Sequence, residues 1–358
     1  MLKKQILGLY LFFKYNFFKL KKIIDQEFED NLEKTISKIY QKLSTDCEEI
    51  LQKYDINYDL IKDNFRVFFE EDFPEEFYEN DSGVVFYKGN WELLQKGFYK
   101  IAVVGSRKSL NVSSNFVTKF IGNLGVLKNV VVVSGLALGI DSIALKKSME
   151  NNIKTIAILG NGVDYYYPYA NKNLQEKISQ NGLLISEYLP NQKPEKYFFP
   201  YRNRLISAIS DLVIVVQAGK NSGSIITGKY ALEMGKNLLV PYLSPSEEFE
   251  GSKELINNGS TMITKPEEIF QFLDNILLPD NKLTINNELV SGNSIQEEKF
   301  NEVLTDEILK IVKNNPGISV EKIAEIQNLP LPEIMKKITL LEIQGRVSVG
   351  FNYSVYIT

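Results

Sequence analysis

The sequence predicts an α/β protein built on a doubly wound, mostly parallel sheet. Between residues 101 and 242, six short and almost continuously apolar runs alternate with helical patterns. Most of these runs end in Gly, Ser or Glu. Strands that are apolar at every position are buried on both faces, which requires helices on each side of a parallel sheet. The expected architecture is therefore Rossmann-like.

The six apolar runs are the expected strands of a central domain that we place at residues 66–270. Residues 66–98 form a connecting extension rich in Asp, Glu and Phe, which ends in the short strand and turn VVFYKGN. The runs that follow are IAVVG, VVVVSG, TIAILG, LLISE, LVIVVQA and NLLVPY, at residues 101–105, 130–135, 155–160, 183–187, 212–218 and 237–242.

Two smaller domains are expected on either side of the central one. Residues 1–65 read as a helical N-terminal domain, because apolar positions recur every three or four residues. Residues 271–300 are a polar, acidic linker. Residues 301–358 have the pattern of a winged helix, with helices expected at 304–314, 319–327 and 331–345 and a hairpin at 346–349 and 354–357.

Composition excludes several classes of site. The chain of 358 residues has a single cysteine, Cys47, and no histidine. This rules out an internal disulfide, the usual histidine-containing zinc sites and histidine-based catalytic triads. The apolar run near the N-terminus is interrupted at Lys14 and is too short to cross a bilayer. We therefore expect a cytoplasmic protein without a membrane segment.

The distribution of charge indicates a polyanion site in the central domain. The net charge is −4, yet residues 101–245 carry sixteen Lys and Arg against eight Asp and Glu. Only five arginines stand beside thirty-six lysines, and three of the five are Arg107, Arg202 and Arg204. A guanidinium group offers several donors in a plane and is well suited to phosphate. A basic centre between acidic flanks is typical of a local nucleic-acid site.

Four loops that follow predicted strands are rich in Gly, Ser or Arg, namely Gly105–Arg107, Ser134–Asp141, Gly160–Gly162 and Ser222–Ser224. Open parallel sheets bind ligands at the carboxyl ends of their strands, and helix N-termini offer unpaired N–H groups to anions. The chain has neither a GxGxxG fingerprint in its first strand–helix turn nor a Walker A motif. We expect a phosphate-binding surface with no cofactor and no metal.

A set of motifs in this region resembles a known family. VVGSR, SGLALGID, ILGNGVDYYYP, NGLLISEY, FPYRNRLISAISDLVIVVQA and SGSIITGKYALEMGK occur in the order and spacing of the DNA-processing protein A family (DprA, also called Smf). The resemblance covers roughly residues 66–265. It implies a homodimer that is not an enzyme and binds single-stranded DNA. It also implies that the protein protects incoming strands during natural transformation and loads the RecA recombinase onto them.

The same resemblance implies which residues contact DNA. Phe199 would stack on a base, and the two arginines of the RNR motif would hold successive phosphates. The expected DNA-binding residues are Arg107, Ser134, Gly135, Lys196, Phe199, Arg202, Asn203, Arg204, Ser222, Gly223, Ser224, Thr227 and Lys229.

Two of these assignments have structural alternatives that the sequence leaves open. Phe199 precedes a proline and would instead fill the core beneath its loop. One of Arg202 and Arg204 would instead pair with Glu187 or Asp211 and shape the loop.

Three neighbouring features have structural interpretations as well. Asn203 is either a ligand contact or an internal hydrogen-bonding brace. Asp141 is expected to cap or brace its helix. The tyrosines at 165–167 resemble a stacking cluster, but their place in a strand-end turn favours packing.

The alternative function is that of a nucleotide-binding or nucleotide-cleaving Rossmann-like protein of the phosphoribohydrolase kind. In such an enzyme Glu233, on the helix after Ser222–Ser224, would be a candidate acid. Those enzymes use a PGGxGT-type loop, however, and this chain has SGSIITG. Single-stranded DNA binding is therefore the favoured prediction.

Overall fold

The computed structural model describes residues 1–28, 31–125, 127 and 129–273, and most of 307–357 apart from short gaps. The described residues fall into two compact units. One comprises the described residues of 1–125 and 129–266, and the other comprises the described residues of 267–358 together with residue 127. Each unit has its own hydrophobic core.

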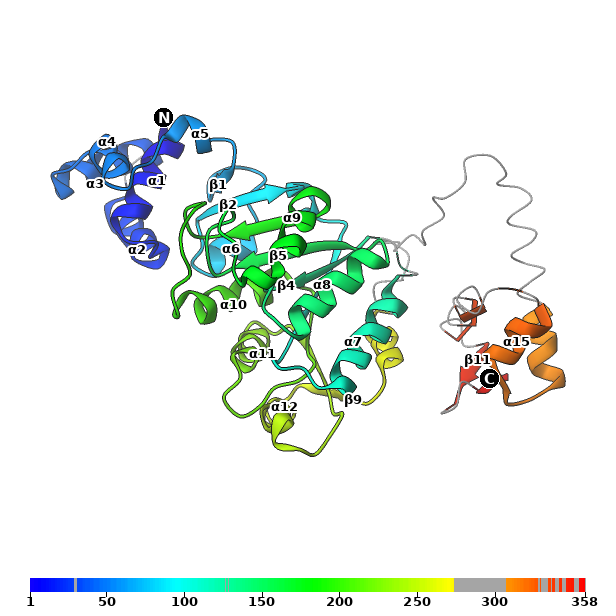
Figure 1. Ribbon diagram of the computed structural model, residues 1–358. Coiled ribbons are helices and arrows are strands. Elements are labelled where there is room, and N and C mark those ends of the chain that lie inside the picture. Colours follow the sequence, from blue (N-terminus) through cyan, green and yellow to red (C-terminus); the bar gives the residue numbers. More distant parts are fainter. Residues whose placement is uncertain are drawn as a thin grey trace, which may run out of the picture. The chain divides into compact units, whose positions relative to one another are not determined.

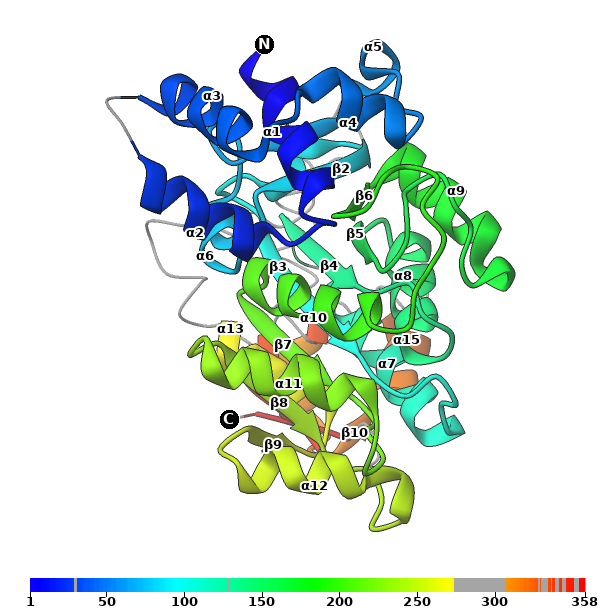
Figure 2. The ribbon, with the colours of Figure 1, turned by 90° about the vertical axis from the view of Figure 1, so that its left-hand side faces the viewer.

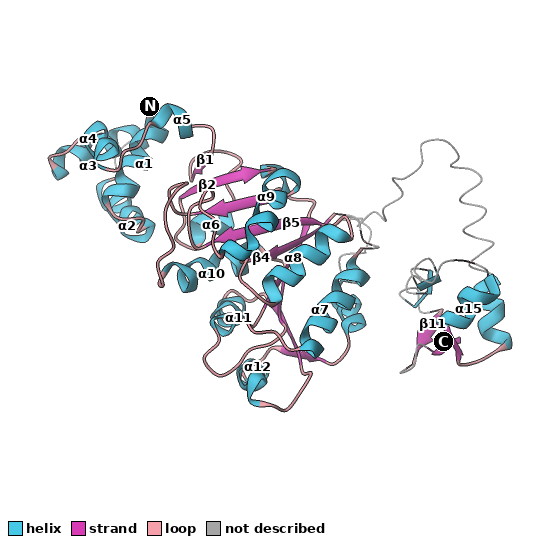
Figure 3. Ribbon diagram, viewed as in Figure 1, coloured by secondary structure: helices cyan, strands magenta, loops and turns pink. Residues whose placement is uncertain are grey.

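The first unit is built on a nine-stranded sheet (Figures 1 and 3), and this confirms the predicted α/β class. The order of the strands is β1-β2-β6-β5-β4-β3-β7-β8-β9. The seven strands from β6 to β9 pair in parallel, whereas β1 and β2 add an antiparallel edge. The strands are β1 (Phe65–Val67), β2 (Val84–Gly89), β3 (Tyr99–Val104), β4 (Val130–Ser134), β5 (Lys154–Leu159), β6 (Leu183–Ser186), β7 (Leu212–Val215), β8 (Asn237–Pro241) and β9 (Thr261–Ile263).

All six predicted apolar runs are strands of this sheet, and VVFYKGN contains β2. The short edge strands β1 and β9 were not predicted. Each has only three residues, and β9 has two exposed positions, so neither produces a continuous apolar run. Edge strands of this kind depend on a neighbouring strand for their pairing rather than on their own sequence.

Helices cover both faces of the sheet, as expected for a doubly wound fold. On one face α10 and α11 pack on alternate strand residues such as Val104 and Val215. On the other face α8 and α9 pack on residues such as Ala157 and Leu184. The helices of this part are α6 (Glu75–Glu79), α7 (Asn111–Leu124), α8 (Ile140–Glu150), α9 (Lys172–Asn181), α10 (Phe198–Ile209), α11 (Gly223–Glu233) and α12 (Glu250–Asn257).

The chain order reverses at β3, and this places the site. From β3 the sheet grows through β4 and β5 to β6 on one side, and then resumes with β7 on the other side of β3. The carboxyl ends of β3 and β7 are therefore neighbours whose following loops diverge. A crevice at such a switch point is the usual ligand site of open α/β sheets.

The N-terminal helices are not a separate unit. They are α1 (Leu2–Phe12), α2 (Phe17–Glu27), α3 (Leu32–Leu43), α4 (Cys47–Lys53) and α5 (Tyr58–Ile61). Apolar residues of α1–α4 share one core with Phe65, Val67, Val84 and Phe86 of the antiparallel edge. The helices thus cover the antiparallel edge of the sheet, which β1 and β2 form (Figure 2).

The second unit contains β10 (Ile318–Ser319), α15 (Val320–Gln327), β11 (Val347–Val349) and β12 (Ser354–Ile357). The three strands form an antiparallel sheet in the order β10-β12-β11. The hairpin and the helix lie where the sequence places them, and the winged-helix assignment stays a prediction. The described residues of the third expected helix, from 334 to 342, are helical. Apart from α13 (Phe270–Leu273), the expected linker lies outside the described residues.

Among the residues described, none of the helices combines the length and the apolarity that crossing a membrane requires.

Candidate functional site

A pocket of about 1230 Å³ opens at the switch point of the sheet. Its walls are the loop after β3, the start of α10, and the loop after β7 that leads into α11. Tyr167 contributes from the loop after β5, and Glu247 and Glu250 from the segment before α12. Of the expected site residues, the pocket brings together Arg107, Lys196, Phe199, Arg202, Asn203, Ser222, Gly223, Ser224 and Thr227.

The loop that carries Arg107 is held from two sides. Buried Gln217, just after β7, accepts a hydrogen bond from the Leu110 amide at 3.0 Å and donates to the Lys108 carbonyl at 3.3 Å. On the other side, the Ile140 amide donates to the Ser106 carbonyl at 3.2 Å. Gly139 permits this approach: its φ is +77°, and a side chain there would overlap the Ser106 carbonyl oxygen. Arg107 is therefore exposed on a fixed loop.

Phe199 lies near a cation and a second ring. The Arg107 guanidinium carbon is 5.5 Å from the centroid of the Phe199 ring, and the Tyr167 ring centroid is also 5.5 Å away. One edge of Phe199 contacts Gly160, where an added Cβ would come within 2.6 Å of the ring. Phe199 is only half buried and lines the pocket, so it presents an aromatic surface rather than filling the core.

Arg202 forms the floor of the pocket. Its side chain is 4% exposed, and Nη1 donates to the carbonyls of Gly135 and Ile158 at the ends of β4 and β5. Burial lowers the pKa of Arg202 to about 10, against the opposing charge of Asp141. Nε donates to Asn203, and Nη2 has no hydrogen-bond partner among the described residues. Arg202 thus ties the strand ends together and brings a buried positive charge to the pocket.

Asp141 is a brace, as expected. Its Oδ2 accepts hydrogen bonds from the amides of Gly135 at 3.1 Å and Ala137 at 3.4 Å. Burial raises the pKa of Asp141, while the charge of Arg202 and the backbone amides act in the opposite direction. The carboxylate holds the turn after β4 and faces Arg202.

Asn203 connects Arg202 to the helix on the other side of the pocket. Its Oδ1 accepts from Arg202 Nε at 3.1 Å, and its Nδ2 donates to the Gly223 carbonyl at 3.1 Å. The brace interpretation is therefore the one that the contacts support. At the start of α11 the hydroxyl of Ser222 accepts from the Ser224 amide, and the two serine hydroxyls are 2.7 Å apart. Gly223 is exposed, so this helix N-terminus is accessible from the pocket.

Four cationic side chains that line the pocket form no ion pair with a described carboxylate. Among the residues described, no carboxylate lies within 4.0 Å of the charged groups of Arg107, Lys108, Lys196 or Lys220. The carboxylates that line the pocket are Asp141 at its floor and Glu247 and Glu250 at one edge. The pocket therefore carries more positive than negative charge, and its two glutamates lie on the α12 side.

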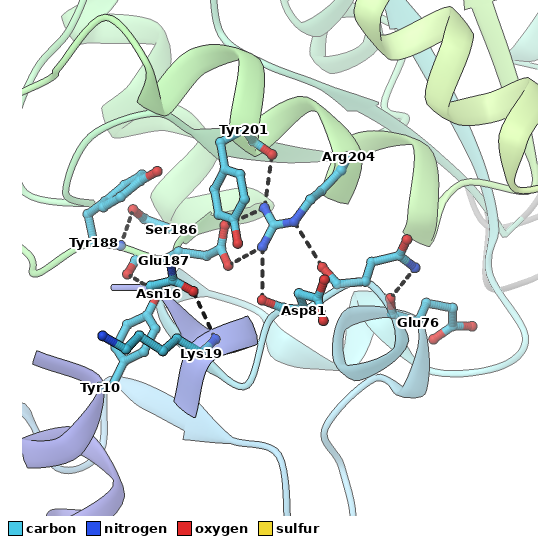
Figure 4. A network of polar contacts seen from close by, with 11 residues as sticks. Tyr10, Asn16, Lys19, Glu76, Asp81, Ser186, Glu187, Tyr188, Tyr201 and Arg204 are labelled. Carbon is cyan, nitrogen blue, oxygen red and sulfur yellow. Dashed lines mark hydrogen bonds and ion pairs between the residues drawn. The ribbon is translucent and has the colours of Figure 1, made fainter. Parts of the chain in front are cut away.

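Arg204 is not part of the pocket, which corrects the expectation that it holds a phosphate. It is 5% exposed and forms a bidentate ion pair with Glu187, with nitrogen–oxygen distances of 2.6 and 2.7 Å (Figure 4). Nε and Nη2 also donate to the carbonyls of Asn80 and Asp81, and the group stacks on the Tyr201 ring at 3.6 Å. Burial acts to lower the pKa of Arg204, but the charge and hydrogen bonds of Glu187 raise it overall. The alternative in which one arginine pairs with Glu187 is the correct one.

Three more of the expected DNA-binding residues do not line the pocket. The Ser134 hydroxyl is buried and donates to the Val103 carbonyl at 2.6 Å. Gly135 is buried beneath Arg202, because a Cβ there would lie 2.5 Å from Nη2. Lys229 pairs with Glu254 at 2.8 Å on the outer side of α11. The first two support the site from below, and Lys229 does not line it.

Several groups that line the pocket were not predicted from the sequence. Tyr167 was assigned to packing, but it is 40% exposed and contacts Phe199. Lys108 and Lys220 adjoin the expected loops and were omitted, although a rule that counts every cation in a strand-end loop would have found them. No sequence motif marked Glu247 and Glu250 as pocket residues, because their position depends on how the segment before α12 packs against the rest of the fold. Glu233, the candidate acid of the enzyme hypothesis, does not line the pocket.

Fold and site together define a doubly wound α/β protein with an open, cation-rich pocket at its switch point. The chain belongs to the family described as DNA recombination-mediator protein A, whose model matches residues 64–274. The matched segment contains the whole pocket.

Individual relatives agree with this assignment. DNA processing protein DprA of Streptococcus pneumoniae is 41% identical over 187 residues, which is 52% of this chain and 65% of that protein. The X-ray structure of the Streptococcus pneumoniae protein superposes with a TM-score of 0.58 at 31% identity, covering 75% of this chain and 92% of that one. DNA processing protein A of Helicobacter pylori, described for its single-stranded DNA binding mode, gives 0.53 at 30% identity, covering 59% and 96%.

Proposed function

We propose that the protein binds single-stranded DNA in this pocket and does not act on it as an enzyme. The observation that carries the proposal is the position of Arg107 beside the half-buried ring of Phe199 in the lining of the pocket. A cation beside an accessible ring lets a nucleotide place its phosphate and its base at adjacent points. Backbone neutralisation combined with stacking is how single strands are held with little sequence preference.

The remaining groups have distinct parts in the proposed mode. Lys108, Lys196 and Lys220 neutralise phosphates on either side of the ring. The open N-terminus of α11, with Ser222 and Ser224, accepts a further phosphate. Arg202 contributes charge from the floor without releasing its own hydrogen bonds. Duplex DNA keeps its bases stacked inside the helix, so the aromatic surface favours single strands.

We further propose the cellular role that the family name suggests. The protein would hold incoming single strands in the cytoplasm during natural transformation and deliver them to the RecA recombinase, working as a homodimer. The Helicobacter pylori relative, described as a binder of single-stranded DNA, supports the choice of ligand. The match to the Streptococcus pneumoniae relative spans 65% of that protein, so the activity of the whole protein is part of the proposal.

The experiment is a titration of labelled oligo-dT and of a duplex of the same length, at several salt concentrations. The full-length chain is expected to bind oligo-dT more tightly than duplex. Replacing Arg107 and Lys196 together by Ala is expected to weaken binding and to reduce the slope of log K against log salt by about 0.7 for each lost phosphate contact. Lys229→Ala is the matched control. Equal binding by the double variant and the wild type would reject this pocket.

The enzyme alternative has little support in the geometry. The buried carboxylate of the pocket, Asp141, is occupied by two amides. Glu247 and Glu250 lie at the edge rather than at the start of α11. Incubation with nucleoside monophosphates should therefore release no base, whereas base release that Glu250→Gln abolishes would establish the enzyme.

A further inference from the structure

The turn between α1 and α2 and the first turns of α2 carry an exposed group of cations and rings. We call Lys14, Phe18, Lys19 and Lys22 the α2 patch. All four side chains are exposed, and Phe18 is 57% exposed. Residues 12–22 contain four lysines and no acidic residue, although residues 1–100 as a whole are acidic. The patch is thus a local positive surface in a negative part of the chain.

The lysine ammonium groups of the α2 patch form no ion pairs with described residues of the protein. Among the described residues, no carboxylate lies within 4.0 Å of Lys14, Lys19 or Lys22. The Lys19 ammonium lies 5.3 Å from the centroid of the Phe13 ring. This contact leaves the ammonium group free to bind an anion. The neighbouring Lys21 differs, because it donates to the Tyr78 carbonyl. The acidic Glu27 at the end of α2 is turned toward Lys42 and Lys38.

Tyr15, which follows Lys14 of the α2 patch, packs near the start of α10. The Tyr15 ring lies 6.4 Å from Phe198 and 5.5 Å from Tyr188, and its hydroxyl donates to Gln192 at 3.2 Å. Phe198 precedes Phe199 of the pocket at the start of α10, where the α1–α2 turn lies beside α10 (Figure 2).

The segment just before Phe199 carries an exposed ring and further cations. Tyr197 is 63% exposed and packs edge-on against Phe198 at 4.7 Å. Lys193 and Lys196 are exposed in the same segment, and one carboxylate, Glu195, lies between them. Residues 193–199, which contact Tyr15 through Phe198 and line the pocket with Lys196 and Phe199, are therefore basic and aromatic.

We propose that the α2 patch is a second contact surface for the single strand that occupies the pocket. The strand leaves Phe199 past Tyr197 and continues over α2, where lysines hold phosphates and Phe18 stacks on a base. This inference rests on the proposed function and extends its binding site beyond the switch point.

A membrane surface is the other polyanion that a basic helix could meet, and the packing of α2 argues against it. The apolar face of α2, formed by Phe17, Leu20 and Ile24, is buried in the protein core. An interfacial helix needs such a face for insertion between lipids. An isolated exposed Phe18 among lysines suits a stacked base better.

The test compares oligo-dT of two lengths on the full-length chain. A strand on the order of 6 nucleotides fills the pocket alone, and one of about 20 nucleotides also reaches the α2 patch. Replacing Lys14, Lys19 and Lys22 together by Ala is expected to raise Kd about tenfold for the long strand. The salt slope for that strand falls by about 0.7 per lost contact, and Kd for the short strand does not change.

The matched control removes three exposed lysines elsewhere, Lys53, Lys146 and Lys177, and should leave both affinities unchanged. In addition, the long strand is expected to quench the fluorescence of the tryptophan in Phe18→Trp, and the short strand is not. The native Trp91 is buried, so a change in fluorescence would report on position 18.

If the triple variant binds the long strand as tightly as the wild type does, the inference about the α2 patch is wrong. The proposed DNA site in the pocket is unaffected by that result. Failure of the wild type to bind either strand overturns the proposed function and this inference together. Binding of phosphatidylglycerol vesicles that depends on the three lysines, with long-strand affinity unchanged, assigns the α2 patch to a membrane instead.

Discussion

Arg202 and Arg204 lie two residues apart on α10, yet their guanidinium groups point to different parts of the molecule. Arg202 reaches the carbonyls of Gly135 and Ile158 at the floor of the pocket. Arg204 reaches Glu187 and the carbonyls of Asn80 and Asp81. Since successive residues of a helix are rotated by about 100°, positions two apart point in nearly opposite directions. One arginine serves the site, and the other attaches α10 to the edge of the sheet.

Loss of the Arg204–Glu187 pair should destabilise the fold. Glu187 also accepts a hydrogen bond from Tyr10 of α1 through its backbone carbonyl, at 3.0 Å (Figure 4). Arg204→Ala leaves a buried carboxylate without its partner, so we expect the free energy of unfolding to fall by about 3–5 kcal/mol in urea titrations.

The exposed pair of Lys229 and Glu254 is the control for this prediction. Lys229→Ala should cost less than about 1 kcal/mol, because solvent screens that pair. A loss of similar size for both variants would contradict the structural role assigned to Arg204.

Substitution of Phe199 should separate stacking from charge. Stacking of a base on an aromatic ring contributes about 1–3 kcal/mol, so Phe199→Leu should weaken oligo-dT binding by about 5- to 150-fold. Phe199→Trp should retain binding, and the salt slope should be the same in both variants because no cation is removed. A Leu variant with wild-type affinity and an unchanged melting temperature would show that the ring does not contact the strand.

Gly135→Ala should displace Arg202 from the pocket floor. The added Cβ would lie 2.5 Å from Nη2, and overpacking of this kind costs about 1–3 kcal/mol of stability. We expect weaker oligo-dT binding as well, because the buried charge moves. Gly122→Ala is the control: it lies exposed on α7 and does not line the pocket, its Cβ meets nothing within 4 Å, and alanine favours the helix. Equal effects in the two variants would argue against the close contact.

Stability should decline above pH 10 because of buried tyrosines. Burial raises the pKa of Tyr201 to about 12, whereas an unfolded tyrosine ionises near pH 10. Between these values the folded state holds more protons than the unfolded state, so stability is full below pH 10 and falls as pH rises. Burial of Arg202 acts in the opposite direction, because its pKa is lowered.

The readout is therefore the difference between the wild type and Tyr201→Phe in urea titrations from pH 8 to 12. The variant should lose stability less steeply between pH 10 and about 12, by roughly 2 kcal/mol over the interval. Parallel curves would exclude Tyr201 as a contributor.

Much of the fold was predictable because its signals are local. Six continuous apolar runs specified the parallel strands, and the Gly- and Ser-rich loops marked their carboxyl ends. Arg107, Lys196 and Phe199 were placed in one site by the resemblance to the DNA-processing protein A family, and the structure brings all three to one pocket. Tyr167 could not be placed there, since its exposure depends on how the loop after β5 meets α10. The edge strands β1 and β9 were missed because each is defined by its neighbour.

The sequence alone determined the class of fold, the loops that form the pocket and the basic character of that region, since composition and periodicity depend only on residues near one another in the chain. The tertiary structure decided which of the two RNR arginines faces the pocket, and that the N-terminal helices share a core with the sheet. It also brought Tyr15, which follows Lys14 of the α2 patch, near Phe198 of α10. Those outcomes depend on partners such as Glu187 and Asn80, which are 17 and 124 residues from Arg204 in the sequence and meet it only when the chain folds. Packing against such distant partners, rather than local preference, sets the direction of a buried side chain.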